Sequence, residues 1–268
     1  MIPDIRLNDG RSMPQVGLGV MKMPEDETEA LCRGAIELGY RAIDAAPGYK
    51  NEAGVGAAVR NSGETVFVTT KLWNANHGAE LGRRAFEASL ATLGRIDLYL
   101  IHWPAPERDL YVETWKLLVA LRDEGRVGSI GVSNFLPEHL ERIIDATGVV
   151  PVTNQVELHP YFQQTELRAF HDQNGIATTC WAPLGRARLL DEPVLADIAA
   201  KVGRSPAQVV LRWHVQLGSI VIPKASSRAR QAENLALFDF ELDDDDMARM
   251  AALDRRDGRY GPHPNDLN

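Results

Sequence analysis

The sequence predicts an α/β protein, a (β/α)8 TIM barrel with an N-terminal β-hairpin cap. Short apolar runs alternate with amphipathic stretches along nearly the whole chain, and eight such β-α units can be counted. Eight units in about 250 residues is the length that a barrel of this kind needs. The 268 residues contain no linker or low-complexity tract, so we expect one domain, residues 1–268.

The predicted strands are short runs rich in β-branched and aromatic residues, as expected for strands that are buried on both faces. They are Val16–Val20, Arg41–Asp44, Val66–Thr70, Leu98–His102, Ser129–Ser133, Val152–Val156, Ala177–Trp181 and Ser219–Ile222. The first run is rich in glycine and carries the weakest strand signal of the eight.

Segments with helical periodicity lie between these runs. They cover 27–38, 51–61, 79–93, 111–124, 137–146, 164–174, 193–202, 205–217 and 227–235. Several ends carry the expected punctuation: Gly39 and Gly125 follow two of the helices, and Pro206 stands in the first turn after Ser205.

The N-terminal stretch DIRLNDGRSMPQV has a different pattern. Two short alternating runs flank Asn8-Asp9-Gly10, which predicts a hairpin that caps the bottom of the barrel. The competing architecture is an open doubly wound sheet, which usually has a Gly-rich fingerprint after its first strand. Here the first strand is followed by GVMKMPEDE, which does not fit that fingerprint.

The composition limits the function classes. A net charge of −8, from 29 Lys and Arg against 37 Asp and Glu, argues against a nucleic-acid or anionic-membrane surface. No apolar stretch approaches the roughly 20 residues of a membrane span. The N-terminus lacks the basic and apolar segments of a secretory signal. We therefore expect a cytoplasmic protein, and a monomer because no coiled-coil repeat or large exposed apolar segment demands a partner.

Metal chemistry has little support in the sequence. Cys32 and Cys180 have no neighbour at metal-ligand spacing and read as two reduced core thiols. The acidic run Asp243–Asp246 lacks the glycine and the terminal glutamate of a calcium loop, so we expect it to begin a helix. The histidines show no ligand spacing, and we expect no metal.

Four reactive side chains stand at the ends of three successive predicted strands. They are Asp44 and Tyr49 in RAIDAAPGYKNE, Lys71 in VFVTTKLW and His102 in LYLIHWP. In a parallel α/β sheet, ligands bind outside the carboxyl ends of the strands, so these side chains should meet at one rim. Each residue alone has a structural explanation, but the four together predict a catalytic site.

The residue types are those needed to protonate a carbonyl oxygen. Tyr49 is the candidate proton donor, although a free phenol, with a pKa near 10, is a poor acid at neutral pH. The ammonium of Lys71 should lower that pKa, and Asp44 should hold Lys71 charged in the barrel mouth. His102 can orient the carbonyl oxygen.

Protonation is half of a reduction, and the hydride must come from elsewhere. The segment GVGAAV lies in a helical stretch and lacks the third glycine of a dinucleotide loop, which favours helix packing. The later strand ends serve better, because Trp181 offers a flat face for a nicotinamide ring. Groups able to fix the nicotinamide carboxamide are carried by Ser133, Asn134 and Gln155.

A cationic cluster after the last strand is a candidate phosphate site. Lys224, Arg228 and Arg230 open a helix in an otherwise acidic chain, next to the hydroxyl of Ser226. Cations beside a hydroxyl suit an additional phosphate monoester, which points to NADPH over NADH. The alternative is a solvated basic helix end.

These motifs resemble those of the aldo-keto reductases, in particular the small bacterial members of the 2,5-diketo-D-gluconate reductase type. The matching segments run almost end to end: LNDGRSMPQVGLGV, GYRAIDAAPGYKNEAGVGAA, TTKLWN, DLYLIHWPAP, GRVGSIGVSNF, NQVELHPYFQQ, WAPLG and IPKASSRARQAENL. The resemblance implies a (β/α)8 barrel. It also implies a set of site residues: the tetrad Asp44, Tyr49, Lys71 and His102; nicotinamide contacts at Ser133, Asn134, Gln155 and Trp181; adenosine-phosphate contacts at Lys224, Ser226 and Arg230; and Glu233 and Asn234 near the adenine.

Three departures from the family pattern stand out. Ala45 follows the catalytic aspartate where relatives often have threonine. Ala225 replaces a serine or threonine, which removes one hydroxyl contact to the 2′-phosphate and weakens the preference for NADPH over NADH. The loop from Pro104 to Tyr111 is short, which suggests an open pocket.

The expected function is NADPH-dependent reduction of small aldehydes, ketones or keto sugars, with NADH as a weaker cofactor. Candidate pocket walls, which also suit packing at the barrel rim, are Val20, Met21, Trp73, Trp103 and Phe135, along with the tail around Tyr260 and His263. A rival from another class is a non-catalytic NADPH-binding accessory module on the same barrel, against which the intact tetrad argues. A third alternative is a metal-dependent barrel hydrolase, which has little support because the sequence shows no His/Asp cluster that could bind the metal.

Overall fold

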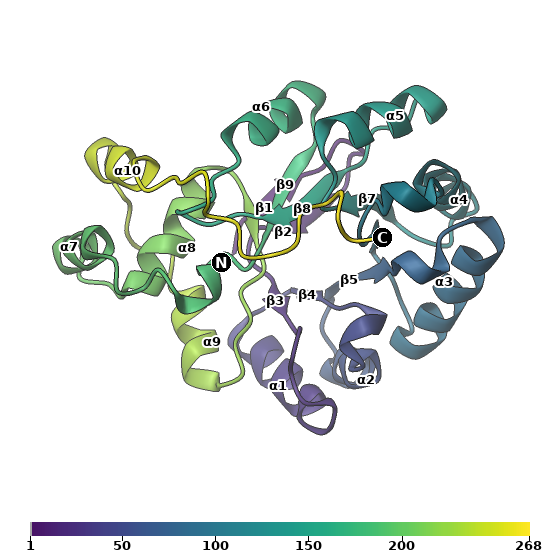
Figure 1. The fold of residues 1–268 in the computed structure, drawn as a ribbon. Coiled ribbons are helices and arrows are strands. Elements are labelled where there is room, and N and C mark those ends of the chain that lie inside the picture. The colour runs from purple at the N-terminus through teal and green to yellow at the C-terminus, as the bar shows by residue number, and fades with distance from the viewer. Residues whose placement is uncertain (1) are drawn as a thin grey trace.

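Eight parallel strands form the centre of the molecule in a computed structural model that describes residues 2–268 (Figure 1). Each strand pairs with the next along the chain. They are β3 (Leu18–Gly19), β4 (Ala42–Asp44), β5 (Phe67–Leu72), β6 (Leu98–Ile101), β7 (Ser129–Ser133), β8 (Thr153–Glu157), β9 (Ala177–Trp181) and β10 (Ile220–Val221). Parallel bridges between Val16 and Val221 and between Gly19 and Lys224 join the first strand to the last. The sheet therefore closes, and the predicted barrel is confirmed.

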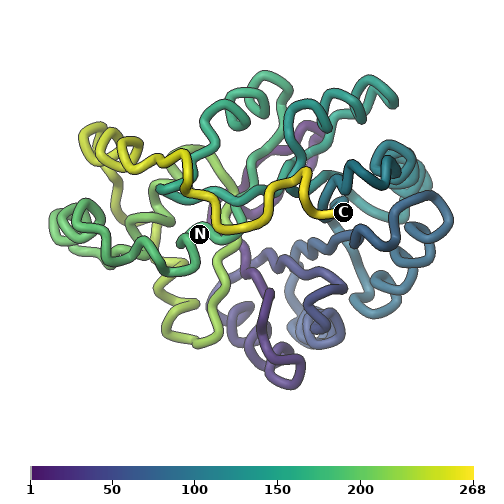
Figure 2. The backbone as a smooth tube through the Cα atoms, viewed as in Figure 1, coloured from purple at the N-terminus to yellow at the C-terminus, as the bar shows by residue number. Residues whose placement is uncertain are grey.

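Helices surround this barrel (Figures 1 and 2). They are α1 (Glu25–Leu38), α2 (Glu52–Ser62), α3 (Ala79–Leu93), α4 (Tyr111–Asp123), α5 (Pro137–Thr147), α6 (Thr165–Asn174), α7 (Pro193–Val202), α8 (Pro206–Gln216), α9 (Arg228–Leu235) and α10 (Asp244–Ala251). Short 3-10 turns follow four strands: η1 (Pro47–Tyr49), η2 (Asn74–Asn76), η3 (Pro106–Arg108) and η4 (Gly185–Ala187).

The end signals read from the sequence act as expected. Gly39 ends α1 in the left-handed region, with φ 109°. Ser205 caps α8 by accepting a hydrogen bond from the backbone of Gln208, and Pro206 occupies the first turn. The end strands β3 and β10 are shorter than predicted. Pro223, just after β10, has no N–H to extend the ladder.

The N-terminal hairpin closes the bottom of the barrel. Strands β1 (Asp4–Arg6) and β2 (Ser12–Pro14) pair antiparallel. The side chains of Leu7 and Met13 are buried in a small cluster with Leu98, Leu100 and Ile220 of the barrel strands and with Val152, which directly precedes β8. Leu98 and Leu100 are alternate residues of β6 and so share one face. The predicted cap is confirmed.

The larger core lies between the barrel and its helices, and it contains both cysteines. Cys32 and Cys180 are buried and form no disulfide, as predicted. Burial raises the pKa of each thiol to about 12. These are core thiols that stay protonated.

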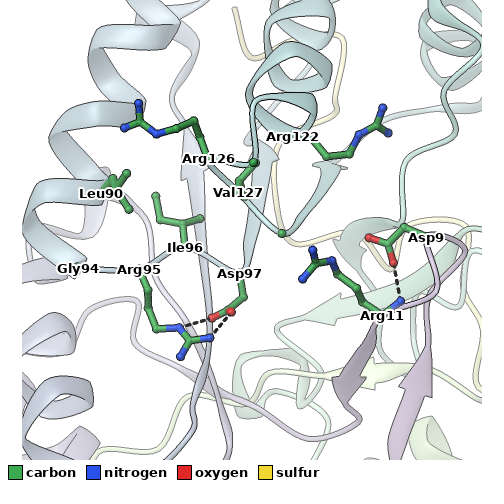
Figure 3. A pocket seen from close by; sticks show the side chains of 12 residues that line it. Asp9, Arg11, Leu90, Gly94, Arg95, Ile96, Asp97, Arg122, Arg126 and Val127 are labelled. Carbon is green, nitrogen blue, oxygen red and sulfur yellow. Dashed lines mark hydrogen bonds and ion pairs between the residues drawn. The ribbon is translucent and has the colours of Figure 1, made fainter.

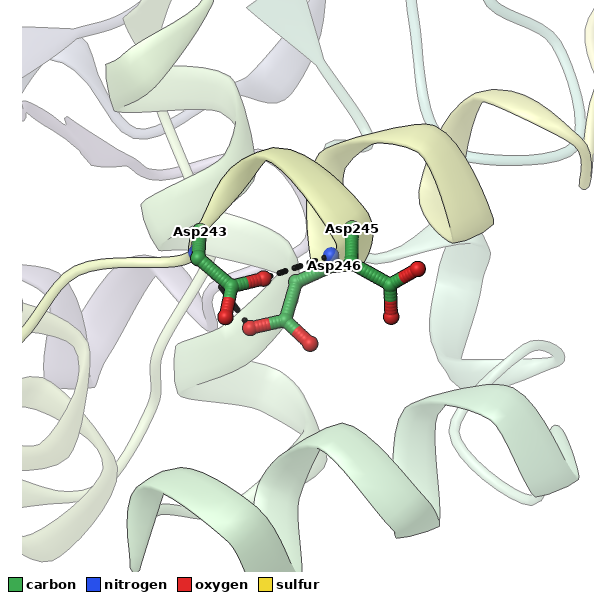
Figure 4. Close-up of side chains that lie close together, drawn as sticks. All are labelled: Asp243, Asp245 and Asp246. Atoms are coloured by element: carbon green, nitrogen blue, oxygen red, sulfur yellow. Dashed lines mark hydrogen bonds between the residues drawn. The ribbon is translucent and has the colours of Figure 1, made fainter.

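The acidic run at 243–246 begins α10, as predicted (Figure 4). Asp243 accepts a hydrogen bond from the backbone of Asp246 at 2.9 Å. Lys201 lies 2.6 Å from Asp243 and 2.9 Å from Asp246, so an ion pair and a helix cap account for the cluster. No helix within residues 2–268 is long and apolar enough to span a membrane.

The segment after α10 runs back across the carboxyl ends of the strands (Figures 1 and 2). We call residues 252–268 the tail. Its end is held at η2 and η3, where Asn74 donates to the carbonyl of Leu267 at 3.2 Å and the backbone of Glu107 donates to Asn268 at 2.9 Å. The tail therefore lies over the rim to which the sequence assigned the catalytic residues.

Candidate active site

Lys71 is the centre of the predicted catalytic cluster. Its ammonium, 0% exposed, donates to Asp44 Oδ2 at 2.6 Å, to the carbonyl of Ala45 at 2.9 Å and to the Tyr49 hydroxyl at 3.4 Å. Asp44 ends β4, Lys71 lies near the end of β5, and Tyr49 ends η1. Burial alone would lower the pKa of Lys71, but Asp44 and Tyr49 raise it above its ordinary value. The ammonium therefore stays charged.

Tyr49 differs from the sequence expectation in one respect. Lys71 does act to lower the pKa of the phenol, but burial has the larger effect, and the pKa is raised above its ordinary value. The expectation of a net lowering is therefore wrong for the protein by itself, because desolvation penalises the phenolate. At neutral pH Tyr49 holds its proton.

His102 lies beside Tyr49 at the same rim. Its ring meets that of Tyr49 edge-on at 6.1 Å and that of Trp73 at 5.1 Å. Burial, together with the charge of Lys71, holds the pKa of His102 well below its ordinary value. Nδ1 is buried and has no hydrogen-bond partner within residues 2–268. The imidazole is therefore neutral and can donate one hydrogen bond.

The candidate nicotinamide contacts form a connected network next to this cluster. Gln155 donates to Asp44 Oδ1 at 2.8 Å, a link to the catalytic cluster that sequence reasoning missed. Ser133 donates to the carbonyl of Gln155 at 2.7 Å. Asn134 donates to Ser133 at 3.0 Å and accepts from Trp181 Nε1 at 2.8 Å, which fixes the indole. The four residues lie together, as predicted.

The candidate phosphate contacts lie at the start of α9. Lys224, Ser226 and Arg230 are exposed, and Lys224 Nζ lies 3.0 Å from the Ser226 hydroxyl. Arg228 turns away and pairs with Glu37 at 3.0 Å, so it leaves the cationic cluster. Farther along the helix, Asn234 is buried.

Glu233, in the last turn of α9, accepts a hydrogen bond from Ser205. The structure thus places Glu233 and Asn234 on the helix that carries Arg230. Their predicted contact with the adenine stays a prediction.

This donor set fits a dinucleotide that carries an additional phosphate. A half-buried indole stands at the end of β9, and two cations, a hydroxyl and a helix N-terminus follow the neighbouring strand β10. Phosphates are favoured where cations and a helix N-terminus converge. Ala225 is buried, so it presents no group at this surface.

The predicted pocket walls divide into two groups. Met21 and Trp73 are 43% and 38% exposed at the rim, and Trp103 is nearly buried. Val20 and Phe135 have no exposed surface, and Phe135 packs edge-on against Tyr111 at 5.7 Å. Val20 and Phe135 thus lie behind the rim, and contact with a substrate stays a prediction for all five.

A cavity of about 680 Å³ lies at the opposite end of the barrel (Figure 3). Its lining includes Asp97, just before β6, and Gly128, just before β7. Arg95 pairs with Asp97, whose Oδ2 also accepts from the backbone of Val68 at 2.8 Å. These contacts tie the amino ends of the strands together, far from the catalytic rim.

Comparison with known proteins agrees with the fold. Residues 14–255 match the model of the aldo/keto reductase family. An aldo-keto reductase of Mycolicibacterium smegmatis is 50% identical over 100% of this chain and 99% of its own length. Methylglyoxal reductase DkgA of Escherichia coli K12 is 47% identical over 97% of this chain and 96% of its own length.

Solved structures agree as well. A Gox0644 mutant in complex with NADPH superposes with a TM-score of 0.98 at 52% identity, covering 100% of this chain and 99% of that one. An aldo/keto reductase from Brucella melitensis superposes with a TM-score of 0.92 at 50% identity, covering 95% and 100%. The resemblance read from the motifs is confirmed: the chain belongs to the aldo/keto reductase family.

Proposed function

We propose that this protein reduces small aldehydes and ketones to alcohols, with Tyr49 as the proton donor. It is an NADP(H)-dependent oxidoreductase of the aldo/keto reductase family and acts on small carbonyl compounds. The observation that supports the tyrosine role is the continuous chain of hydrogen bonds from Asp44 through Lys71 to Tyr49, at 2.6 Å and 3.4 Å.

Each end of the cofactor has candidate partners in this chain. NADPH, when bound, supplies the hydride. Trp181 offers the plane for its nicotinamide, and Asn134 fixes the orientation of that plane. Lys224, Ser226 and Arg230 would hold the adenosine phosphates by charge-assisted hydrogen bonds.

Tyr49 delivers the proton to the carbonyl oxygen as negative charge develops there. The buried ammonium of Lys71 stabilises the phenolate that is left behind. Asp44 compensates the charge of Lys71, and Gln155 in turn holds the other oxygen of Asp44. The cluster is thus preorganised by groups that never touch the substrate.

His102 orients the substrate. Its low pKa keeps the imidazole neutral, which suits a hydrogen-bond donor to the carbonyl oxygen and leaves the proton transfer to Tyr49. The backbone N–H of His102 is bonded to Leu72 at 3.0 Å, and its carbonyl accepts from Asn134, so the ring is mounted on a fixed support.

The substrate class we propose is small reactive carbonyl compounds, with 2-oxoaldehydes and keto sugars as the first to test. Relatives 45–47% identical carry the name methylglyoxal reductase, which supports this choice. A panel of aldehydes, ketones and keto sugars, assayed with NADPH and NADH side by side, ranks the substrates.

The decisive variant is Tyr49→Phe. It removes the transferable proton, and turnover of the best substrate should fall by about 10²–10⁴-fold, the usual contribution of a general acid. NADPH affinity, measured by fluorescence titration, should stay unchanged. A matched control is Tyr99→Phe, because the Tyr99 hydroxyl is buried and has no partner within residues 2–268.

Near-normal turnover in Tyr49→Phe would contradict the assignment. NADPH binding by the wild-type protein without turnover of any carbonyl in the panel would favour the non-catalytic accessory module instead. The hydrogen bonds from Asp44 through Lys71 to Tyr49 favour the enzyme, because an accessory module has no need of a buried ammonium at the barrel mouth.

A further inference from the structure

The tail is attached to the barrel by a buried carboxylate that the proposed chemistry does not use. Glu157, 1% exposed, accepts hydrogen bonds from two consecutive backbone N–H groups of the tail: Oε1 from Tyr260 at 2.7 Å and Oε2 from Gly261 at 2.8 Å. Oε1 also lies 3.1 Å from Nε2 of His159. Both oxygens are therefore engaged, and a carboxylate is the side chain whose two oxygens can both accept.

Glu157 stands directly beside the candidate nicotinamide platform. It is the last residue of β8, two positions after Gln155, so both side chains leave the same face of the strand. In the parallel ladder Glu157 is the register partner of Trp181 on β9. The strand that holds Asp44 through Gln155 thus holds the tail through Glu157.

Gly261 fills the space between the carboxylate and the indole. A Cβ atom built on Gly261 would lie 2.6 Å from Cη2 of Trp181 and 2.9 Å from Oε2 of Glu157. The tail backbone is therefore in contact with the six-membered end of the indole. At the five-membered end of the indole, Nε1 of Trp181 donates to Asn134 at 2.8 Å.

The neighbouring tail residue adds a second anchor. The ring of Tyr260 stacks on that of His159, with the ring centroids 4.7 Å apart and an interplanar angle of 19°. The guanidinium of Arg188 lies 4.9 Å from the centroid of the same Tyr260 ring. His159 is itself fully buried. The Tyr260–Gly261 segment is thus held by a bidentate hydrogen bond, a stacked ring and a cation.

We propose that Glu157 is a positioning residue for Trp181. Its hydrogen bonds to the tail keep the backbone of Gly261 in contact with one end of the indole, while Asn134 accepts a hydrogen bond from the other end. The two contacts together fix the plane on which the nicotinamide stacks. The inference rests on the proposed function only in that NADPH binds at Trp181, and it requires no turnover to be tested.

Two substitutions disturb this contact in opposite directions. Glu157→Gln places an amide N–H group against one of the backbone N–H donors and so loosens the tail. Gly261→Ala leaves Glu157 intact but drives a methyl group into the indole edge. We expect each to raise the NADPH dissociation constant by about tenfold, measured by fluorescence titration without a carbonyl substrate.

Limited trypsin digestion separates the two effects, because Arg255, Arg256 and Arg259 stand at the start of the tail. Glu157→Gln should speed cleavage at these sites, and Gly261→Ala much less. Glu113→Gln is a matched control, because the carboxylate of Glu113, on α4, also accepts from a backbone N–H, that of Ala79 at the start of α3, at 2.9 Å, but does not contact the tail. In the Glu113→Gln control, neither the NADPH dissociation constant nor the rate of trypsin cleavage should change.

A double-mutant cycle tests whether the effect passes through the indole. In a Trp181→Ala background, Glu157→Gln should change the NADPH dissociation constant by less than about twofold, because there is no ring left to position. An equal effect of Glu157→Gln in both backgrounds would overturn the proposal, and so would unchanged NADPH affinity in both Glu157→Gln and Gly261→Ala. If the variants change NADPH binding as expected but the wild-type protein turns over no carbonyl compound, the proposed function is contradicted and the role of Glu157 is not.

Discussion

At the scale of single residues, the catalytic cluster depends on a buried ion pair. Lys71 is fully buried, and its ammonium is balanced by Asp44 at 2.6 Å. An isolated charge at this position would be strongly unfavourable, so each partner depends on the other. The pairing was predictable from the sequence, because Asp44 ends one strand and Lys71 lies near the end of its neighbour.

The substitution Lys71→Met separates the structural role of the pair from its chemical role. It leaves the carboxylate of Asp44 buried without a counter-ion and should lower the free energy of unfolding by about 3–5 kcal/mol. Turnover should fall at least about 100-fold, because the phenolate of Tyr49 loses its stabilising cation. Urea unfolding and NADPH oxidation assays measure the two effects.

The double variant Lys71→Met/Asp44→Asn is the control for this prediction. It removes both charges, so most of the lost stability should return while turnover stays low. Recovery of activity together with stability would show that Lys71 acts only through folding.

At the scale of elements, two arginines in the first turn of α9 have different surroundings. Arg228 and Arg230 are two residues apart, yet Arg228 pairs with Glu37 on α1 at 3.0 Å, whereas Arg230 stays exposed beside the helix N-terminus. Residues two apart on a helix do not face the same way. The sequence shows three cations near the start of α9. The packing of α1 against α9 engages one of them, Arg228, in an ion pair and so takes it out of the candidate phosphate site.

The pair Arg230→Ala and Arg228→Ala tests this division. Arg230→Ala should raise the dissociation constant of NADPH by about tenfold, the loss of one charge-assisted contact, and leave that of NADH nearly unchanged. Arg228→Ala should leave both unchanged. Fluorescence titration with each cofactor gives the values. Equal weakening of NADPH and NADH in Arg230→Ala would rule out a contact to the additional phosphate.

At the scale of the whole molecule, the barrel separates stability from chemistry. The hairpin and the interior leucines close one end, and the strand ends at the other carry the tetrad. Several histidines are buried in the surrounding shell. Burial lowers the pKa of His77 and of His171 to about 4, and that of His214 to about 3.

These histidines predict acid sensitivity of the fold. Their folded pKa values lie below the unfolded value near 6.5, so the unfolded state binds more protons as the pH falls. The stability that these neutral histidines contribute is thus fully present above pH 6.5 and is lost as the pH falls from about 6.5 to about 4 for His77 and His171, and to about 3 for His214. Urea unfolding at pH 7.5, 5.5 and 4.5 should show a decrease on the order of several kcal/mol.

His77→Leu isolates one contribution. Both ring nitrogens of His77 lack a hydrogen-bond partner in the described part of the chain, so the substitution removes a titrating group and no hydrogen bond there. The decrease in stability from pH 7.5 to 4.5 should shrink by about 2–3 kcal/mol relative to the wild type. An unchanged pH dependence would show that His77 does not stay neutral in the folded state.

Comparison of particular elements shows what could be predicted from the sequence. The runs Ser129–Ser133 and Ala177–Trp181 coincide with β7 and β9, because strands buried on both faces leave short runs without charged residues. Glu157 was missed, although an acidic residue two positions after Gln155 in a buried strand was a visible signal. Its partners are backbone groups about 100 residues away, which no local pattern encodes.

The sequence by itself determined the eight β-α units, the N-terminal hairpin and the residue types at the strand ends. These follow from local periodicity and from the rule that parallel strands bring their carboxyl ends to one rim. Only the tertiary structure decided the pKa direction of Tyr49, the ion pair of Arg228 with Glu37 and the contact of the tail with the edge of Trp181. Desolvation, ion pairing and contact distances depend on which distant segments pack together, and that packing exists only in the folded chain.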